Sequence, residues 1–560
     1  MNAETFLKQF GHLADAPNGV QKLRELVLQL AVRGRLAGQR PGDEPVEKLV
    51  GQILSHKSAV TGKLSRMAPV ETKQLGFDIP ESWTVARFGD IVINRDGERV
   101  PVSKEIRETR KGPYDYYGAS GVIDKIDGFL FDKPLLLIGE DGANLINRST
   151  PIAFIAEGKY WVNNHAHVLD GISREFLNYI ALFVNATDLK PYVTGTAQPK
   201  MNQAKMNSIP VALPPLAEQH RIVAKVDELL ALCDELEAQQ ARWNVVRTAF
   251  AAASLARLTA APTPAETAGE WSRVAHHFDT LFAVPQTIPQ LRQTILQLAV
   301  TGRLVEQDEG DEPAEKLLER IDVIRTAPTG SSKTRTLKEP RQVSDTALPF
   351  ELPAGWCWTR LGSLLLDLRY GTAKKCGYSK NGTPVLRIPN LVDGRISLED
   401  LKYGDLDASE RTELGIQSGD ILLIRSNGSE SLVGRMAVAG SESEGCAFAG
   451  YLMRLRTSTK DVDPQFVRFA CDTAFVRHQI EAPIRTTSGV KNINSTEVVN
   501  LLLPLPPHRL QLKIIGRIAE LFAQCDALEV QLTTRQGTAE RLTAAMVQGV
   551  LEGAGSAAQA

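Results

Sequence analysis

An internal duplication constrains the fold of this chain more than any other feature. The segment LRELVLQLAVRGRL at 23–36 recurs as LRQTILQLAVTGRL at 291–304, with ten identities in fourteen positions. GDEPVEKLV, beginning at Gly42, recurs as GDEPAEKLL from Gly310, again 268 positions later. Because chance similarity does not preserve an offset, we infer a tandem repeat of one helix-plus-globule unit.

A second repeated pair, 214–239 and 506–531, predicts two long spacer helices. Each copy begins with two prolines, which are tolerated in the first turn of a helix and not in its interior, so each helix should start just after them. The apolar positions then alternate by four and three, as in a coiled-coil seam. They are Ile222, Val226, Leu229, Cys233 and Leu236 in the first copy and Ile514, Ile518, Leu521, Cys525, Leu528 and Leu532 in the second. We expect the two helices to pack antiparallel.

The order of the repeated helices predicts how the chain closes on itself. Its middle contains a spacer helix, a segment at 257–289 that we interpret as a linker with a turn, and then the helix at 291–302. The C-terminus ends with a spacer helix and the N-terminus begins with the other helix type. Joining the two ends would therefore recreate the middle, and we expect a pseudo-twofold, nearly circular arrangement with the ends close together.

The segments between the repeated helices, about 79–213 and 352–503, match only at their edges. Trp83 corresponds to Trp356 and Thr194 to Thr486, whereas the interiors share almost nothing. A duplicated frame with two unlike modules favours a protein that holds two different recognition surfaces; drift after duplication is the alternative. Short apolar runs separated by Gly, Asn and Asp predict a mostly antiparallel, twisted sheet or half-barrel, closed by helices near 176–184 and 466–480. The fold class is thus α+β.

Composition sets broad limits. A chain of 560 residues with 43% hydrophobic and 23% charged residues should form several globular domains. Neither a signal peptide nor an uninterrupted run of eighteen apolar residues is found, so we expect a cytoplasmic protein without a membrane segment. The six cysteines lack a CxxC pair and are interpreted as buried thiols. A net charge of −2 does not exclude nucleic acid, because acidic helix faces mask locally basic loops in the average.

Catalytic motifs do not accompany this architecture. The sequence has no Walker loop, no GxGxxG after a strand and no HExxH. A fused methyltransferase would need an Asn-Pro-Pro-aromatic motif, but every Pro-Pro pair here is followed by Leu or His. His165 and His167 alternate as metal ligands on a strand would, yet core or strand-end hydrogen bonding is the simpler interpretation. An alternative hypothesis is that the chain is a helical adaptor whose modules bind proteins rather than nucleic acid.

Several motifs are similar to those of one known family. They are LLLIGEDGANL with WVNNHAHVL and TGTAQPKMNQAKMNSIPVALPPLAEQHRIV in the first half, and IRSNGSESLVGRM with TTSGVKNINSTEVVNLLLPLPP in the second. Together with the repeat architecture, they resemble the DNA-specificity (S) subunit of type I restriction-modification systems. The long helical segment before the first module departs from many relatives, where it follows the second module.

The resemblance implies a non-catalytic subunit that recognises a bipartite, asymmetric target in double-stranded DNA. Two methyltransferase subunits and restriction (motor) subunits would dock on it. No cofactor is expected in this chain; S-adenosylmethionine, ATP and Mg²⁺ would act in the partner subunits. The target sequence and the length of its gap are not readable from the chain, because DNA deformation also contributes to specificity.

We divide the chain into an N-terminal helical segment (1–75), recognition module 1 (76–213), a central helical region (214–345), recognition module 2 (346–505) and a C-terminal spacer helix (506–560). Candidate DNA contacts combine Arg, which binds guanine edges, Asn, which binds adenine edges, lysines for phosphates, and loop aromatics and small residues. GTAQPK and TTSGVK, at equivalent positions before the spacer helices, are the best-supported pair; a plain β-to-α connection is their alternative. The candidates are Tyr116, Tyr117, Ser120, Asn144, Gln198 and Lys200 in module 1, and Arg387, Asn390, Arg425, Asn427, Arg435, Ser488 and Lys491 in module 2.

Overall fold

The computed structural model describes residues 8, 10–64, 66–195, 198–261, 263–327, 339–344, 348–482, 485–487 and 490–553. The chain forms two compact units. Unit 1 comprises Met1–Trp243 with Thr534–Ala560, and unit 2 comprises Asn244–Thr533. Each unit therefore contains one recognition module together with helices from both halves of the chain.

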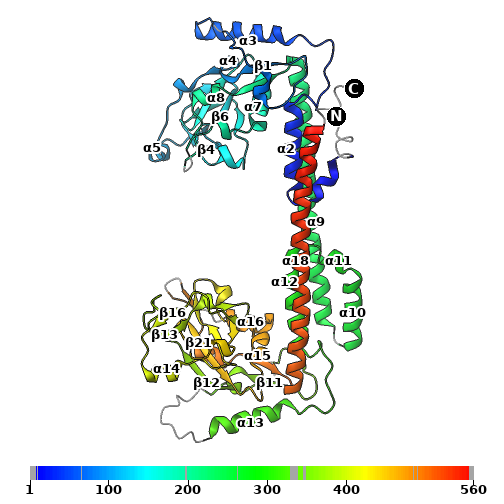
Figure 1. Ribbon diagram of the computed structural model, residues 1–560, viewed down its shortest axis with the longest axis vertical. Helices are drawn as coiled ribbons and strands as arrows, with labels where there is room; N and C mark the ends of the chain where they lie inside the picture. The colour runs from blue at the N-terminus through cyan, green and yellow to red at the C-terminus, as the bar shows by residue number, and fades with distance from the viewer. Residues whose placement is uncertain are drawn as a thin grey trace. The chain divides into compact units, whose positions relative to one another are not determined.

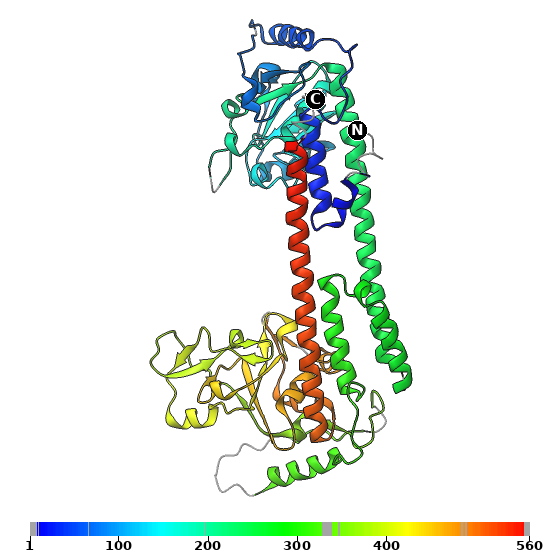
Figure 2. The same cartoon turned by 45° about the vertical axis from the view of Figure 1, so that its right-hand side comes forward.

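Three helices support module 1 in unit 1. They are α2 (Gly19–Val32), the first part of α9 (Leu216–Ala260) and the last part of α18 (His508–Gly553), which lie side by side in both views (Figures 1 and 2). Apolar side chains of α2 at i, i+3, i+4 and i+7 are buried, as an amphipathic helix requires. The end of α18 is fixed to α2 because Arg35 Nη1 donates to the carbonyl of Leu551 at 3.0 Å. The two ends of the chain thus belong to the same unit.

Unit 2 repeats this helical arrangement with exchanged components. Here α12 (Ile288–Val300) takes the place of α2, the first part of α18 that of α9, and the last part of α9 that of α18. Arg303 Nη1 donates to the carbonyl of Thr259 at 2.9 Å, which reproduces the Arg35 contact at the duplicated positions. The pseudo-equivalence predicted from the sequence therefore extends to individual hydrogen bonds, whereas the circular arrangement of the whole chain stays a prediction.

The coiled-coil seam of α9 packs against α2 within unit 1. Ile222, Val226, Leu229 and Cys233 are buried in the same apolar cluster as the inner face of α2. Arg24 on α2 pairs with Asp234 at 2.5 Å and Glu237 at 2.7 Å beside this seam. In unit 2, Arg292 pairs with Asp526 and Glu529 at the duplicated positions. Both spacer helices begin where the prolines predicted, at Leu216 and His508.

The expected linker at 257–289 is wrong for most of its length. It forms α10 (Pro264–His276) and α11 (Phe278–Leu281). The hydroxyl of Thr263 accepts from the backbone N–H of Glu266, and Pro264 occupies the first turn, which is a strong helix start. A proline in the first turn after a capping threonine marks a helix start, which the interpretation as a linker overlooks.

Module 1 contains two four-stranded sheets with strand orders β2-β9-β6-β7 and β4-β3-β8-β5. All pairs are antiparallel except β3 with β8. The strands are β2 (Ile93–Asn94), β3 (Tyr114–Gly118), β4 (Gly121–Ile126), β5 (Phe131–Asp132), β6 (Leu135–Gly139), β7 (Ala153–Ala156), β8 (Lys159–Val162) and β9 (Ala166–Asp170). Helix α7 (Arg174–Ala186) closes the module as expected, with α4 (Phe88–Ile91), α5 (Lys104–Thr109), α6 (Asn144–Asn147) and α8 (Gln203–Asn207) at its edges.

Module 2 has a different sheet topology, with a six-stranded sheet ordered β12-β21-β17-β19-β15-β14 and two three-stranded sheets ordered β16-β13-β20 and β18-β23-β22. Its strands are β12 (Leu365–Tyr370), β13 (Thr383–Leu386), β14 (Leu391–Val392), β15 (Arg395–Ile396), β16 (Lys402–Gly404), β17 (Ile421–Ile424), β18 (Ser426–Asn427), β19 (Met436–Val438), β20 (Ala447–Phe448), β21 (Leu452–Thr457), β22 (Arg485–Thr487) and β23 (Val490–Asn492). The closing helix is divided into α15 (Pro464–Cys471) and α16 (Ala474–Glu481), with α14 (Ala408–Leu414) and α17 (Ser495–Val499) elsewhere in the module.

The edges of both modules are alike although their interiors differ. Module 1 is joined to its helices by the antiparallel pair β1 (Thr84–Arg87) and β10 (Pro210–Leu213), and module 2 by β11 (Cys357–Arg360) and β24 (Leu502–Leu505). Gly34 has a φ of +69°, and a Cβ there would lie 2.5 Å from Pro80. Gly302, also at +69°, is equally confined by Pro353. Glycine is therefore required at both junctions.

Two further helices complete the repeat, α3 (Val46–Thr61) and α13 (Ala314–Thr326). The cysteines are free thiols, and burial raises the pKa of Cys233, the thiol in the α9 seam. Among the described residues, no helix is long and apolar enough to cross a membrane.

Candidate nucleic-acid interface

Three segments of module 1 meet where β6 ends. They are the loop at 139–142, the turn at 163–165 and the segment at 199–201. Glu140 N–H donates to the carbonyl of His165 at 2.8 Å, and Met201 N–H donates to the carbonyl of Glu140 at 2.8 Å. Gly142 N–H donates to the carbonyl of Pro199 at 3.0 Å. The sequence motifs GEDGAN, NNHAH and GTAQPK, far apart along the chain, thus form one site.

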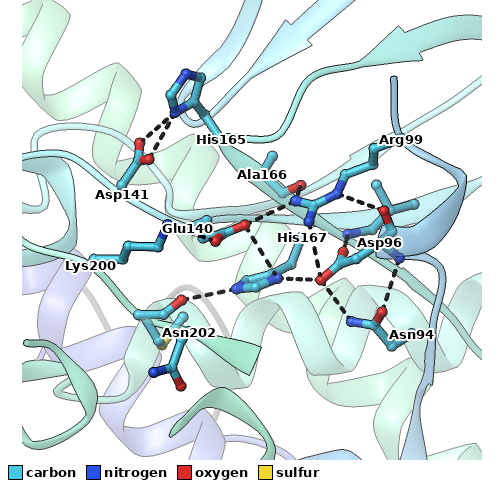
Figure 3. Close-up of polar contacts among 12 residues, drawn as sticks. Asn94, Asp96, Arg99, Glu140, Asp141, His165, Ala166, His167, Lys200 and Asn202 are labelled. Carbon is cyan, nitrogen blue, oxygen red and sulfur yellow. Dashed lines mark hydrogen bonds and ion pairs between the residues drawn. The ribbon is translucent and has the colours of Figure 1, made fainter. Parts of the chain in front are cut away.

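A buried histidine forms the centre of this site (Figure 3). His167 Nδ1 lies 2.6 Å from Asp96 Oδ2 and Nε2 lies 2.9 Å from the carbonyl of Met201. Burial opposes protonation of the imidazole, but the hydrogen bond and charge of Asp96 outweigh it, so the pKa of His167 is raised above its ordinary value. Burial likewise disfavours the charged form of Asp96, yet His167 holds the pKa of that carboxyl below its usual range. Both ring nitrogens of His167 face acceptor oxygens, an arrangement that suits the doubly protonated imidazolium.

Glu140 connects the buried histidine to the surface. Its carboxylate accepts from Arg99 Nη1 at 3.0 Å, lies 3.8 Å from His167 Nδ1 and lies 3.2 Å from Lys200 Nζ. Burial would raise the pKa of Glu140, but Arg99 and the neighbouring cations lower it, so the side chain stays ionised at neutral pH. Lys200 itself is half-exposed, with 52% of its side chain accessible.

A hollow of about 490 Å³ adjoins this site and contains residues that the sequence analysis did not select. Lys104, Arg107, Asn164 and His165 are among its lining residues. Asn164 and His165 are exposed at the turn before β9, and His165 Nδ1 lies 2.8 Å from Asp141. The pair Asn-His in NNHAH was the available signal, because two polar residues interrupt two buried strands there.

The corresponding site in module 2 lies where β17 ends. Ile493 N–H donates to the carbonyl of Arg425 at 2.9 Å, and Asn427 pairs with Lys491 between β18 and β23. The guanidinium of Arg425 lies 4.7 Å from the ring centroid of Tyr370, and its Nη1 donates to the carbonyl of Gly450 at 3.3 Å. Arg425 and Asn427 lie two residues apart at this end of β17, and their contact with base edges stays a prediction.

Lys200 and Lys491 lie in corresponding segments but one position out of register, because Met201 and Ile493 make the equivalent backbone hydrogen bonds to Glu140 and Arg425. Lys200 forms isolated antiparallel bridges with Asp141 and Thr194, and Lys491 pairs with Asn427 and Thr486. Each lysine therefore lies on a segment that pairs with the loop after the central strand of its module, β6 or β17. Each is also ion-paired to a carboxylate of that loop, Glu140 in module 1 and Glu430 in module 2.

Two candidate residues do not fit a DNA contact. Tyr116 is fully buried, and its hydroxyl accepts from the N–H of Val102 at 3.0 Å. Asn390 is also fully buried; its Oδ1 accepts from Arg387 N–H at 2.8 Å and its Nδ2 donates to the carbonyls of Ser397 and Glu399. We reassign both as structural residues, because their polar atoms already have partners inside the protein.

The remaining candidates in module 1 stay predictions. Tyr117 is partly buried and stacks on Phe154 at 5.9 Å. Asn144 Oδ1 accepts from the N–H of Thr150 at 3.1 Å, which orders the loop after the site. Ser120 and Gln198 are exposed.

The remaining candidates in module 2 are dispersed. Arg387 Nη2 pairs with Asp400 at 2.7 Å, and Arg435 Nη1 pairs with Asp472 at 3.2 Å, so both are held by internal carboxylates. Ser488 lies outside the described residues. DNA contact by these side chains is untested.

A profile of the family described as "Type I restriction modification DNA specificity domain" matches residues 80–242. The type I restriction enzyme EcoEI specificity subunit of Escherichia coli is 29% identical over 95% of this chain and 94% of its own length. The EcoAI specificity subunit of the same species is also 29% identical, with the same coverage of both chains. The chain is thus similar over nearly its whole length to type I restriction-modification specificity subunits.

The matches to specificity subunits indicate a non-catalytic chain. A putative type I specificity subunit of Haemophilus influenzae is 38% identical over 24% of this chain and 34% of its own length. The solved HsdS subunit from Thermoanaerobacter tengcongensis is 15% identical over 85% of this chain and 98% of that chain, with a TM-score of 0.39.

Proposed function

We propose that this specificity subunit recognises a two-part, asymmetric sequence in double-stranded DNA, one half through module 1 and the other through module 2. The main support is the combination of repeated supporting helices, matched down to the Arg35 and Arg303 contacts, with modules of unlike sheet topology. A protein that presented one surface twice would need like modules. Equivalent supports with unlike modules fit two different half-sites.

The contacts are divided by chemistry. Lys200 and Lys491 are proposed to bind phosphates, because each is a partly exposed point charge on the corresponding segment of its module. Arg425 and Asn427 are proposed to contact base edges in the second half-site, since Arg suits guanine and Asn suits adenine. Tyr370 restricts the guanidinium of Arg425, which lowers the entropy lost on binding.

We also propose the partner subunits that the resemblance to this family implies. Two methyltransferase subunits and the restriction (motor) subunits would dock on this subunit in the cytoplasm, where they meet chromosomal and incoming DNA. S-adenosylmethionine, ATP and Mg²⁺ would act in those partners.

The experiment is a methylation map. The chain is co-expressed with its methyltransferase subunit in a host lacking adenine methylation, and N6-methyladenine is located by single-molecule sequencing. We expect one motif of two unlike halves separated by a fixed gap. Arg425→Ala should relax one base pair of one half and leave the other half unchanged. A methyltransferase that modifies no motif in the presence of this chain would refute the proposal and favour the protein-binding adaptor.

A further inference from the structure

Each candidate phosphate-binding lysine forms an ion pair with a carboxylate of its own module. Lys200 Nζ lies 3.2 Å from Glu140, and Lys491 is ion-paired to Glu430. The lysines lie one position out of register in corresponding segments, and their carboxylates come from different places: Glu140 immediately follows β6, whereas Glu430 lies six residues beyond the end of β17. The same pairing has therefore been built from two different loops.

Stability does not explain this recurrence. Exposed ion pairs contribute only about 0 to 1 kcal/mol to folding, because solvent screens them. Lys200 is 52% exposed beside Glu140, and Glu430 is 45% exposed beside Lys491, so one partner of each pair faces the solvent that screens the attraction. A carboxylate beside a phosphate-binding amine, by contrast, competes directly with the phosphate and repels it.

Glu140 is held so that it cannot withdraw from Lys200. Only 12% of its side chain is exposed, and Arg99 Nη1 donates to it at 3.0 Å from the protein interior. Asp96 also lies 3.6 Å from Arg99, which fixes the guanidinium in turn. The negative charge at this point of the surface is thus permanent, and DNA meets a lysine whose charge is already compensated.

We propose that Glu140 and Glu430 keep Lys200 and Lys491 out of contact with random-sequence DNA. This inference rests on the proposed function and adds to it a means of limiting non-specific DNA binding. Phosphate neutralisation supplies nearly all non-specific affinity, so two compensated lysines reduce the time that the subunit spends on incorrect DNA. At the correct site, base contacts fix the duplex against the protein and bring a phosphate close enough for the lysine side chain to turn from its carboxylate to the phosphate.

The test is a double-mutant cycle on the full-length chain, measured as fluorescence anisotropy with a labelled duplex of random sequence over a range of salt concentrations. Glu140→Gln should raise affinity by about threefold to tenfold at ~0.1 M salt and steepen the logarithmic salt dependence by about one unit, because one phosphate contact is gained. Lys200→Ala alone should leave random-sequence affinity almost unchanged. In the Glu140→Gln background, Lys200→Ala should abolish the gain.

The matched control is Glu157→Gln. Glu157 is an exposed carboxylate of the same module, paired with Arg174, and it lies next to the end of β7 that pairs with Leu135, at the opposite end of β6 from Glu140. Glu157→Gln removes one negative charge but leaves the pair of Lys200 with Glu140 intact. It should therefore not change the affinity for random-sequence DNA. Glu430→Gln with Lys491→Ala repeats the cycle in module 2.

The outcomes are distinguishable. If the wild-type chain binds DNA but Glu140→Gln binds no more tightly, or if its gain survives Lys200→Ala, the compensation of Lys200 by Glu140 is refuted and the proposed function stands. If no variant binds DNA even at low salt, the proposed function itself fails, and this inference fails with it.

Discussion

Leu255→Ala should weaken unit 2 and leave unit 1 intact. Leu255 lies in the last part of α9, is only 3% exposed and packs in the apolar cluster that contains α12. Its counterpart in the duplication, Val547 near the end of α18, is buried in unit 1. The variant therefore tests whether each spacer helix contributes to the core of both units.

The magnitude follows from burial. A nearly fully buried Leu truncated to Ala costs about 2 to 4 kcal/mol, because the transfer free energy is lost and a cavity remains. If that loss falls on the opening of unit 2, about 3 kcal/mol corresponds to roughly a hundredfold faster exchange of the most protected amides. Val547→Ala removes fewer atoms and should cost about 1 to 2 kcal/mol, in unit 1 instead.

Hydrogen exchange followed by mass spectrometry separates the two units, because peptides covering α2 and α12 have different sequences. We expect faster exchange in α12 for Leu255→Ala and in α2 for Val547→Ala. Leu542→Ala, the same truncation at a residue that is 60% exposed on α18, is the control and should change neither. Equal acceleration of α2 and α12 by Leu255→Ala would refute the assignment of the end of α9 to unit 2.

Three further predictions concern the modules. Tyr116→Phe should lower stability by about 1 kcal/mol in urea unfolding through loss of its hydrogen bonds to Val102, without changing the methylated motif; a changed motif would restore Tyr116 as a contact residue. Because the pKa of His167 is raised, the stability from its pair with Asp96 is fully present below about pH 6.5 and is lost as pH rises through the raised value. The urea midpoint should therefore fall towards alkaline pH in the wild type and fall less in His167→Gln; parallel profiles would contradict this. Arg425→Ala should cost about 1 to 3 kcal/mol on the cognate duplex and relax one base pair, whereas equal weakening on all single-base variants would make Arg425 a backbone contact.

The repeated helices could be predicted because their signals are local in the sequence. In each copy a proline pair ends at Pro215 or Pro507, and the apolar seam follows directly. Both helices begin at the next residue. Such signals can be read from the sequence because caps and periodicity act over a few residues. The helix at 264–276 was missed because its proline was taken for a turn residue rather than for a first-turn residue. A turn and a helix start differ here only in whether the Thr263 hydroxyl accepts a hydrogen bond from the backbone that follows it.

The site was predicted in part, because its parts are distant in sequence. GTAQPK and TTSGVK were correctly paired, since their duplication is visible. The ion pairs of Lys200 with Glu140 and of His167 with Asp96 join residues 60 and 71 positions apart, and no periodicity relates them. Tyr116 was misassigned for a related reason. The register between β3 and β4 shifts between Tyr116 and Tyr117, which alters the alternation that sequence reasoning uses to decide which face of a strand is exposed.

The antiparallel pairs β1–β10 and β11–β24 have a consequence for how such a protein changes its target. In each module the chain enters on one strand and leaves on its hydrogen-bonded neighbour, with Arg87 opposite Pro210 and Arg360 opposite Leu502. Everything between these two strands can be exchanged as a cassette, because the ladder depends on backbone atoms that any sequence supplies. On the proposed function, recombination that respects this two-stranded base would replace one half of a DNA motif in a single event and leave the other half, and the helices that carry both, untouched.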